Sequence, residues 1–178
     1  SPMEFYAVCT DVETGKSVYH RCDKLDDTGL EWLRASASMP MVSRIVEIGG
    51  RKLLDGGISD SIPLRFMEKA GYGKNVVVLT QPRSYTKGKN KLMPVMKMTM
   101  KKYPDFIKTM ENRHKMYNGE LKYIRKAESE GRAFVIAPPE SLPVRRVEHN
   151  PKALLEVYRM GRNCANQQLG ALKLFMEK

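Results

Sequence analysis

The chain has 178 residues, of which 42% are hydrophobic, and it carries a formal net charge of +11. This length suits one domain with a hydrophobic core, or a domain followed by a helical extension. No apolar run approaches the ~18 residues that span a bilayer, which excludes a membrane-spanning helix. Three cysteines without C-x-x-C spacing exclude a disulfide scaffold and a structural zinc site. We therefore expect a cytoplasmic protein without a metal or another cofactor.

The positive charge is unevenly placed along the chain. Residues 1–82 have a net charge of −1, residues 83–132 of +9 and residues 133–178 of +3. A change of this size indicates two different modules. We predict one domain over residues 1–82 and a basic, mainly helical extension over residues 83–178.

In the first part of the chain, the pattern predicts two hairpins and two short helices. Residues 5–10 and 17–21 are expected to pair across a turn, and residues 41–48 and 51–54 across Gly49-Gly50. Asp26-Asp27-Thr28 is a capping sequence for a helix over residues 29–37. Residues 63–70 suit a short helix with proline in its first turn.

Further along, an apolar run over residues 76–80 predicts a strand buried on both faces of a parallel sheet. Apolar residues at helical spacing predict a long amphipathic helix from residue 104 to about 130, with Arg113 in register and a bend at Asn118-Gly119. A strand over residues 133–137 follows, and Asn150-Pro151 begins a helix that runs to the end. Strands mixed with helices indicate an α/β fold.

Asp55-Gly56-Gly57, after the apolar pair Leu53-Leu54, is the most informative triplet. Aspartate and glycine are ordinary turn formers, so the triplet by itself predicts a turn. The alternative is a carboxylate that two glycines aim into a site. The neighbouring sequence decides between these interpretations.

Three stretches occur in a telling order: Thr10-Asp11-x-x-Thr14-Gly15, then Ala35-Ser36-x-Ser38-x-Pro40, then Asp55-Gly56-Gly57. Together they resemble the second half of the patatin-like phospholipase domain. The resemblance covers roughly residues 3–82. It implies the C-terminal part of a three-layer α/β/α domain and makes Asp55 the second member of a Ser–Asp catalytic dyad. Gly56 and Gly57 would form the active-site turn. Ser61 stands where the family often has asparagine.

The nucleophile of that family lies in a G-x-S-x-G elbow, and this chain contains none. The glycine-rich oxyanion loop is also missing. We therefore expect the C-terminal portion of a longer lipid acyl hydrolase, inactive or nearly so without the serine. Its partners would be a lipid acyl ester and either the missing N-terminal half or a second copy of the chain.

Other side chains invite weaker interpretations. Ser36, Ser38 and Ser59 fit local caps and turns better than nucleophiles. The three histidines lack metal-ligand spacing, and the methionines fit core positions or a soft lipid-facing surface.

The basic segment allows three interpretations: a solvated helix face, a membrane surface site or a nucleic-acid site, the last without a supporting motif. A peripheral membrane module without catalytic activity is the alternative function. Candidate contacts with anionic lipid are Lys87, Lys89, Lys91, Lys97, Lys101 and Lys102.

Overall fold

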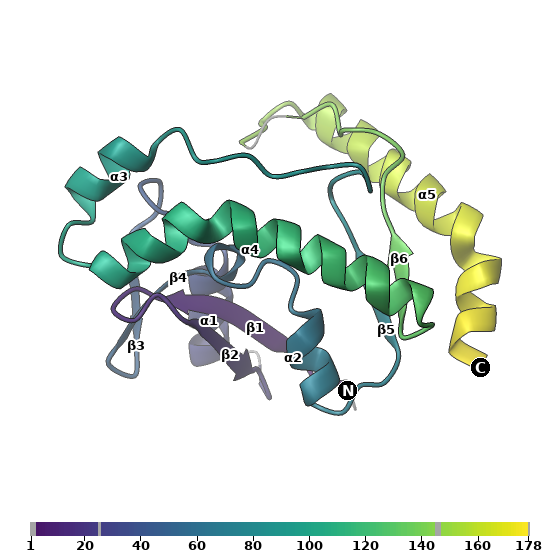
Figure 1. The fold of residues 1–178 in the computed structure, drawn as a ribbon, viewed down its shortest axis with the longest axis horizontal. Coiled ribbons are helices and arrows are strands. Elements are labelled where there is room, and N and C mark those ends of the chain that lie inside the picture. Colours follow the sequence, from purple (N-terminus) through teal and green to yellow (C-terminus); the bar gives the residue numbers. More distant parts are fainter. Residues whose placement is uncertain (1–2, 25, 145–146, 178) are drawn as a thin grey trace. The chain divides into compact units, whose positions relative to one another are not determined.

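The computed structural model describes residues 3–24, 26–144 and 147–177. They form two compact units that interleave along the sequence. Figure 1 labels the helices and strands of the chain. The first unit contains residues up to 63 together with 87–120, and the second contains residues 64–86 together with those from 121 onwards. The predicted mixed α/β class is confirmed. The predicted division at residue 82 concerns modules of the sequence, and it stays a prediction.

The first unit is built on a four-stranded antiparallel sheet in the order β2-β1-β4-β3. Its strands are β1 (Tyr6–Asp11), β2 (Ser17–Arg21), β3 (Val46–Ile48) and β4 (Arg51–Asp55). Both predicted hairpins are present. Gly49 and Gly50 have positive φ angles, 55° and 77°, as a tight two-residue hairpin turn requires.

The predicted strand over residues 41–48 is too long. Residues 39–43 form a turn, Met41 has a φ of 67°, and the strand begins only at Val46. Val42 is 71% exposed, so its apolar side chain has no sheet face to pack on.

Helices cover both faces of this sheet, because successive side chains on a strand alternate between its faces. On one face, Ala7, Cys9 and Leu53 pack against Trp32 and Ala35 of α1 (Asp27–Ser36). On the other face, the buried cluster joins strand residues to α3 (Met93–Thr99) and to the start of α4 (Pro104–Ser129). That cluster contains Val12, Leu54, Ile58, Met96, Phe106 and Met110.

The second unit contains α2 (Leu64–Lys69), the parallel pair β5 (Asn75–Val78) and β6 (Ala133–Ile136), the last turns of α4, and α5 (Pro151–Glu177). The predicted parallel strand is confirmed, but the prediction that it is buried on both faces is wrong. Val77 is buried, whereas Val76 and Val78 are 41% and 69% exposed. The sheet has two strands, and the residues that the structure describes cover one face of β5.

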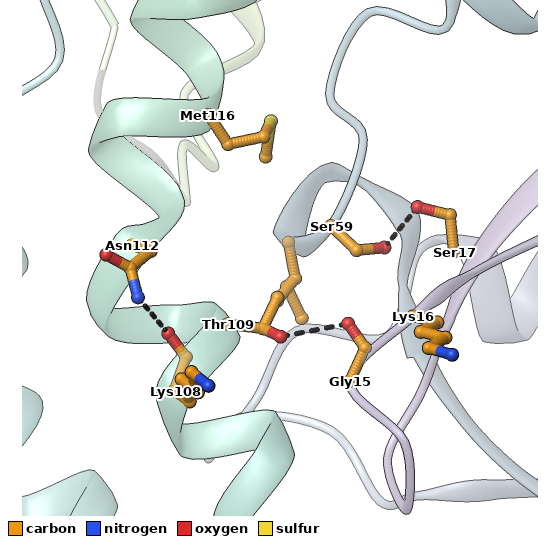
Figure 2. A pocket seen from close by; sticks show the side chains of 9 residues that line it. Gly15, Lys16, Ser17, Ser59, Lys108, Thr109, Asn112 and Met116 are labelled. Carbon is orange, nitrogen blue, oxygen red and sulfur yellow. Dashed lines mark hydrogen bonds between the residues drawn. The ribbon is translucent and has the colours of Figure 1, made fainter.

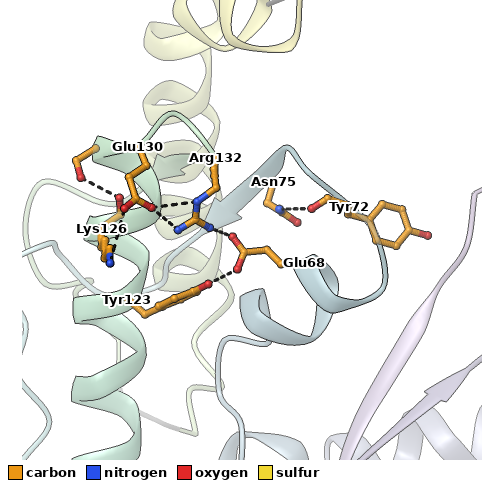
Figure 3. Close-up of polar contacts among 8 residues, drawn as sticks. Glu68, Tyr72, Asn75, Tyr123, Lys126, Glu130 and Arg132 are labelled. Atoms are coloured by element: carbon orange, nitrogen blue, oxygen red, sulfur yellow. Dashed lines mark hydrogen bonds and ion pairs between the residues drawn. The ribbon is translucent and has the colours of Figure 1, made fainter.

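A polar network ties α2 to the last turns of α4 within the second unit (Figure 3). Glu68 accepts hydrogen bonds from the Tyr123 hydroxyl and from the Arg132 guanidinium, which also pairs with Glu130 at 2.5 Å. The Arg65 guanidinium lies 4.0 Å from the centre of the Tyr123 ring. One tyrosine therefore joins a carboxylate and a cation, which fixes the short helix α2.

Both long helices were predicted. The Asn150 side chain accepts a hydrogen bond from the Lys152 N–H at 3.0 Å, which confirms the predicted start of α5.

Helix α4 continues without interruption through Asn118-Gly119. The Asn118 side chain accepts a hydrogen bond from the Lys87 N–H at 2.8 Å and donates one to the Lys87 carbonyl at 3.1 Å. Among the described residues, no helix combines the length and apolar character needed to cross a membrane.

Candidate active site

The three sequence stretches meet at Asp55, the last residue of β4. Its N–H donates to the Ser38 carbonyl at 2.9 Å, and its own carbonyl accepts from the Thr10 hydroxyl at 2.8 Å. Across the sheet, Asp55 pairs with Cys9 of β1. Each of the other two motifs thus contributes one hydrogen bond to the backbone of Asp55, through Thr10 and Ser38. These tertiary contacts fix the position of Asp55.

The Asp55 carboxylate is half-buried and held on one side. Oδ1 accepts the Gly57 N–H at 2.7 Å, while Oδ2 has no hydrogen-bond partner among the described residues. Burial, with the charge of Asp55 as a second cause, raises the pKa of the Cys9 thiol to about 12. At neutral pH the Cys9 side chain is therefore a neutral thiol, which is a poor nucleophile.

The two glycines permit close approaches rather than an unusual φ. A Cβ on Gly56 would overlap the Val8 carbonyl oxygen and lie 2.9 Å from the Val8 Cβ. A Cβ on Gly57 would lie 3.2 Å from Oδ1 of Asp55. The turn of 3₁₀ helix over Gly56–Ile58 therefore packs against β1 while its amide reaches back to the carboxylate.

The nearby serines are engaged in local structure. The Ser36 and Ser38 hydroxyls donate to the Val8 and Arg34 carbonyls, both at 2.7 Å. Ser59 belongs to a hydroxyl chain: Ser17 donates to it at 2.9 Å, and it lies 2.8 Å from the Thr10 hydroxyl. None of these three serines points its hydroxyl at Asp55.

An open cavity of about 430 Å³ lies beside this hydroxyl chain (Figure 2). Ser17 and Ser59 line one side, and Lys108, Asn112 and Met116 of α4 line the other. Asp55 is not among its lining residues, so the cavity is not the site around the predicted catalytic aspartate. Hydrogen bonds from Ser59 through Thr10 to the Asp55 carbonyl link this cavity to Asp55.

Sequence reasoning missed an acidic cluster next to the Asp55 turn. Glu120 of α4 accepts the Ser61 N–H at 3.1 Å through Oε1, while its buried Oε2 has no hydrogen-bond partner. Asp60 accepts from the Tyr19 hydroxyl. Burial first, and then the neighbouring Asp60 carboxyl, raises the pKa of Glu120 from 4.5 to about 9. At neutral pH Glu120 is therefore protonated.

The lysines proposed from sequence to contact lipid differ in their surroundings. The Lys87 ammonium lies 4.7 Å from the Tyr117 ring centre, and Lys97 pairs with Glu111 at 2.6 Å. Lys89, Lys91, Lys101 and Lys102 are exposed. His20 stacks on Trp32 at 4.1 Å. Within residues 3–24, 26–144 and 147–177, no group of three potential metal-binding side chains gathers.

Two families match the sequence. Residues 4–67 match the patatin-like phospholipases, and residues 103–177 match a domain of unknown function, DUF6363. The first match contains the whole set of motifs around Asp55. Over residues 4–67, the chain is similar to the patatin-like phospholipases.

Several bacterial proteins are similar to this chain. The uncharacterized protein YjjU of Escherichia coli (strain K12) is 30% identical over 192 residues, which cover 99% of this chain and 54% of that protein. Two uncharacterized NTE family proteins, Rv1063c of Mycobacterium tuberculosis (strain ATCC 25618 / H37Rv) and Mb1092c of Mycobacterium bovis (strain ATCC BAA-935 / AF2122/97), are each 41% identical over 63 residues. Those residues cover 35% of this chain and 16% of each protein. The chain thus spans about half the length of the first relative and less of the others.

The close approach at Gly56 yields a stability prediction. Gly56→Ala should lower the free energy of unfolding by about 3 kcal/mol, because the new methyl meets a backbone oxygen that cannot turn away. Gly119→Ala is the matched control, since its Cβ would enter open space on a helix. It should raise stability by about 0.5–1 kcal/mol. Urea unfolding measures both, and equal effects would contradict the packing described.

The raised pKa of Glu120 predicts a stability that depends on pH. The folded chain holds an extra proton between pH 4.5 and about 9, so the contribution of Glu120 is complete below this range and is lost as the pH rises through it. Glutamine does not titrate, so Glu120→Gln lacks this pH dependence. The melting temperature of the variant minus that of the unmodified chain should therefore be higher at about pH 9 than at about pH 5. A difference that stays constant across these pH values would refute this assignment.

Proposed function

We propose that this chain supplies the aspartate of a Ser–Asp dyad that hydrolyses lipid acyl esters. The observation that carries the proposal is Asp55, fixed at a strand end within the patatin-like segment, with Oδ1 bound to Gly57 and no hydrogen bond to Oδ2 among the described residues. A base that contacts the serine directly needs this combination of fixed position and free acceptor. The similarity to NTE family proteins supports the same class of chemistry.

In the proposed reaction, the serine oxygen attacks the ester carbonyl carbon while its proton passes to Asp55. The tetrahedral intermediate then breaks its bond to the alcohol oxygen, and Asp55 returns the proton to that leaving group. Water cleaves the acyl-serine by the same steps, with Asp55 again accepting and returning a proton. The serine and the oxyanion donors lie, in this proposal, in a part of the protein outside these 178 residues. The chain alone is then inactive, because loss of a serine nucleophile costs roughly 10⁶ in rate.

The role of Asp55 is tested in a protein that joins this chain to the region with the G-x-S-x-G elbow. Asp55→Asn should lower kcat for a p-nitrophenyl acyl ester about 10³-fold or more, because the asparagine carboxamide is not basic enough to accept the serine proton. Asp23→Asn, which changes an exposed carboxylate paired with Arg21, should keep full activity. Full activity of Asp55→Asn would refute the proposed dyad.

A second proposal concerns a basic surface on the first unit. Leu92, Val95 and Met98 recur every three residues and are 54%, 41% and 70% exposed. The exposed lysines of the segment surround them in the sequence. We call this set the basic patch: Lys89, Lys91, Leu92, Val95, Met98, Lys101 and Lys102. Apolar side chains among lysines suit an anionic membrane surface, where the substrate of a lipid hydrolase resides.

Vesicle sedimentation tests the basic patch. The chain should bind vesicles with 30% anionic lipid. Binding should weaken as the salt concentration rises, because salt screens the lysine charges; the screening length is about 8 Å at 0.15 M. Replacing the four patch lysines with glutamine should weaken binding by about 1 kcal/mol for each charge. The control removes the same charge from four exposed lysines elsewhere: Lys115, Lys122, Lys152 and Lys173. Equal loss in both variants would leave only net charge as the cause and would overturn the patch.

A further inference from the structure

Helix α4 does more than cover the sheet, because it also contacts the turn that follows Asp55. Its residues Phe106 and Met110 are buried in one cluster with Ile58 of that turn. Further along the same face come Arg113, Tyr117 and Glu120, spaced by three or four residues. The helix therefore aims two polar side chains at the turn from the apolar face that anchors it.

Arg113 acts on the peptide groups that hold the catalytic carboxylate. Its Nε donates to the Gly57 carbonyl at 2.7 Å, and the Ser61 hydroxyl donates to the same oxygen at 2.7 Å. The N–H of Gly57 donates to Oδ1 of Asp55 at 2.7 Å. Two hydrogen bonds, one to the Gly57 carbonyl and one from the Gly57 N–H, thus connect the guanidinium to the carboxylate through Gly57. The Ser61 hydroxyl adds a third bond to the same residue.

The guanidinium also lies close to Asp55 in space. The point where a Gly57 Cβ would stand is 3.5 Å from Nη2 of Arg113 and 3.2 Å from Oδ1 of Asp55. The cation is therefore a near neighbour of the carboxylate. A charged donor strengthens a hydrogen bond to a carbonyl, so Gly57 is held firmly.

Glu120 holds the far end of the same turn. Its Oε1 accepts the Ser61 N–H at 3.1 Å. Glu120 comes seven residues, about two helical turns, after Arg113. One side chain therefore donates to the turn and the other accepts from it, which restrains the turn at both ends.

We propose that Arg113, supported by Glu120, is a positioning residue for catalysis by Asp55; this inference rests on the proposed Ser–Asp function. The match to DUF6363 begins at residue 103, so Arg113 and Glu120 lie in that region rather than in the patatin-like segment. The first turns of this region would then belong to the catalytic apparatus. Activity should then depend on α4, through the hydrogen bond from Arg113 to the Gly57 carbonyl.

The experiment uses the protein that contains the upstream serine. Arg113→Met removes the donors while keeping an extended apolar stem, and Arg113→Lys keeps a charged donor. We expect Arg113→Met to lower kcat about 10–100-fold at unchanged KM, since misplacement of a catalytic group by ~1 Å has effects of this size. Arg113→Lys should recover most of that loss. Lys115→Met, at an exposed position on the same helix, is the control and should match the unmodified enzyme.

Two further measurements make every outcome decisive. The folded fraction, from circular dichroism at the assay temperature, corrects kcat for each variant. A loss in Arg113→Met that disappears after this correction, or that Arg113→Lys does not recover, overturns the positioning role. Asp55→Asn is assayed alongside. If it stays active, the proposed function fails; if it is inactive while Arg113→Met equals Lys115→Met, only the present inference fails.

Discussion

The structure around Asp55 depends on direct contact between the 3₁₀ turn and the backbone of β1. Only a residue without a Cβ fits there, because the Val8 carbonyl oxygen occupies that space. With Gly56 against β1, the next amide, that of Gly57, reaches back to Oδ1 of Asp55. The direction of the carboxylate is thus a consequence of backbone packing. The hydroxyls of Thr10 and Ser61 add hydrogen bonds to the carbonyls of Asp55 and Gly57, respectively.

Helix α4 combines two kinds of interaction on one face. Phe106 and Met110 bury apolar area, which holds the helix on the sheet without fixing its direction. Arg113 and Glu120 add directional hydrogen bonds to the turn. The cost of placing Glu120 there is visible in its protonation, since a charged carboxyl group in this position would face both desolvation and the Asp60 carboxyl. A buried polar group kept at such cost suits a role in specifying geometry.

The lysines of the basic patch lie in the segments on either side of α3, within residues 89–102. The basic patch follows from short-range sequence, in which lysines flank the exposed side chains of Leu92, Val95 and Met98. The buried Met96 of the same short helix anchors it to the core. An element with one buried and one exposed apolar side, among lysines, has the composition that the proposed contact with a lipid surface requires.

The sequence by itself determined the hairpins, the long helices and the three motifs that identify the patatin-like segment, because these depend on local periodicity and on residue types at fixed spacing. It also carried one unused signal: Arg113 stands in register with the apolar stripe of its helix, where a charge needs a buried partner. Only the tertiary structure showed that this partner is the Gly57 carbonyl and that Glu120 follows it, since residues 57 and 113 are distant in sequence. The alternating exposure of side chains along β5 was likewise decided by tertiary structure. An apolar run shows which side chains can be buried, but the elements that pack on each face of the strand determine which side chains are buried.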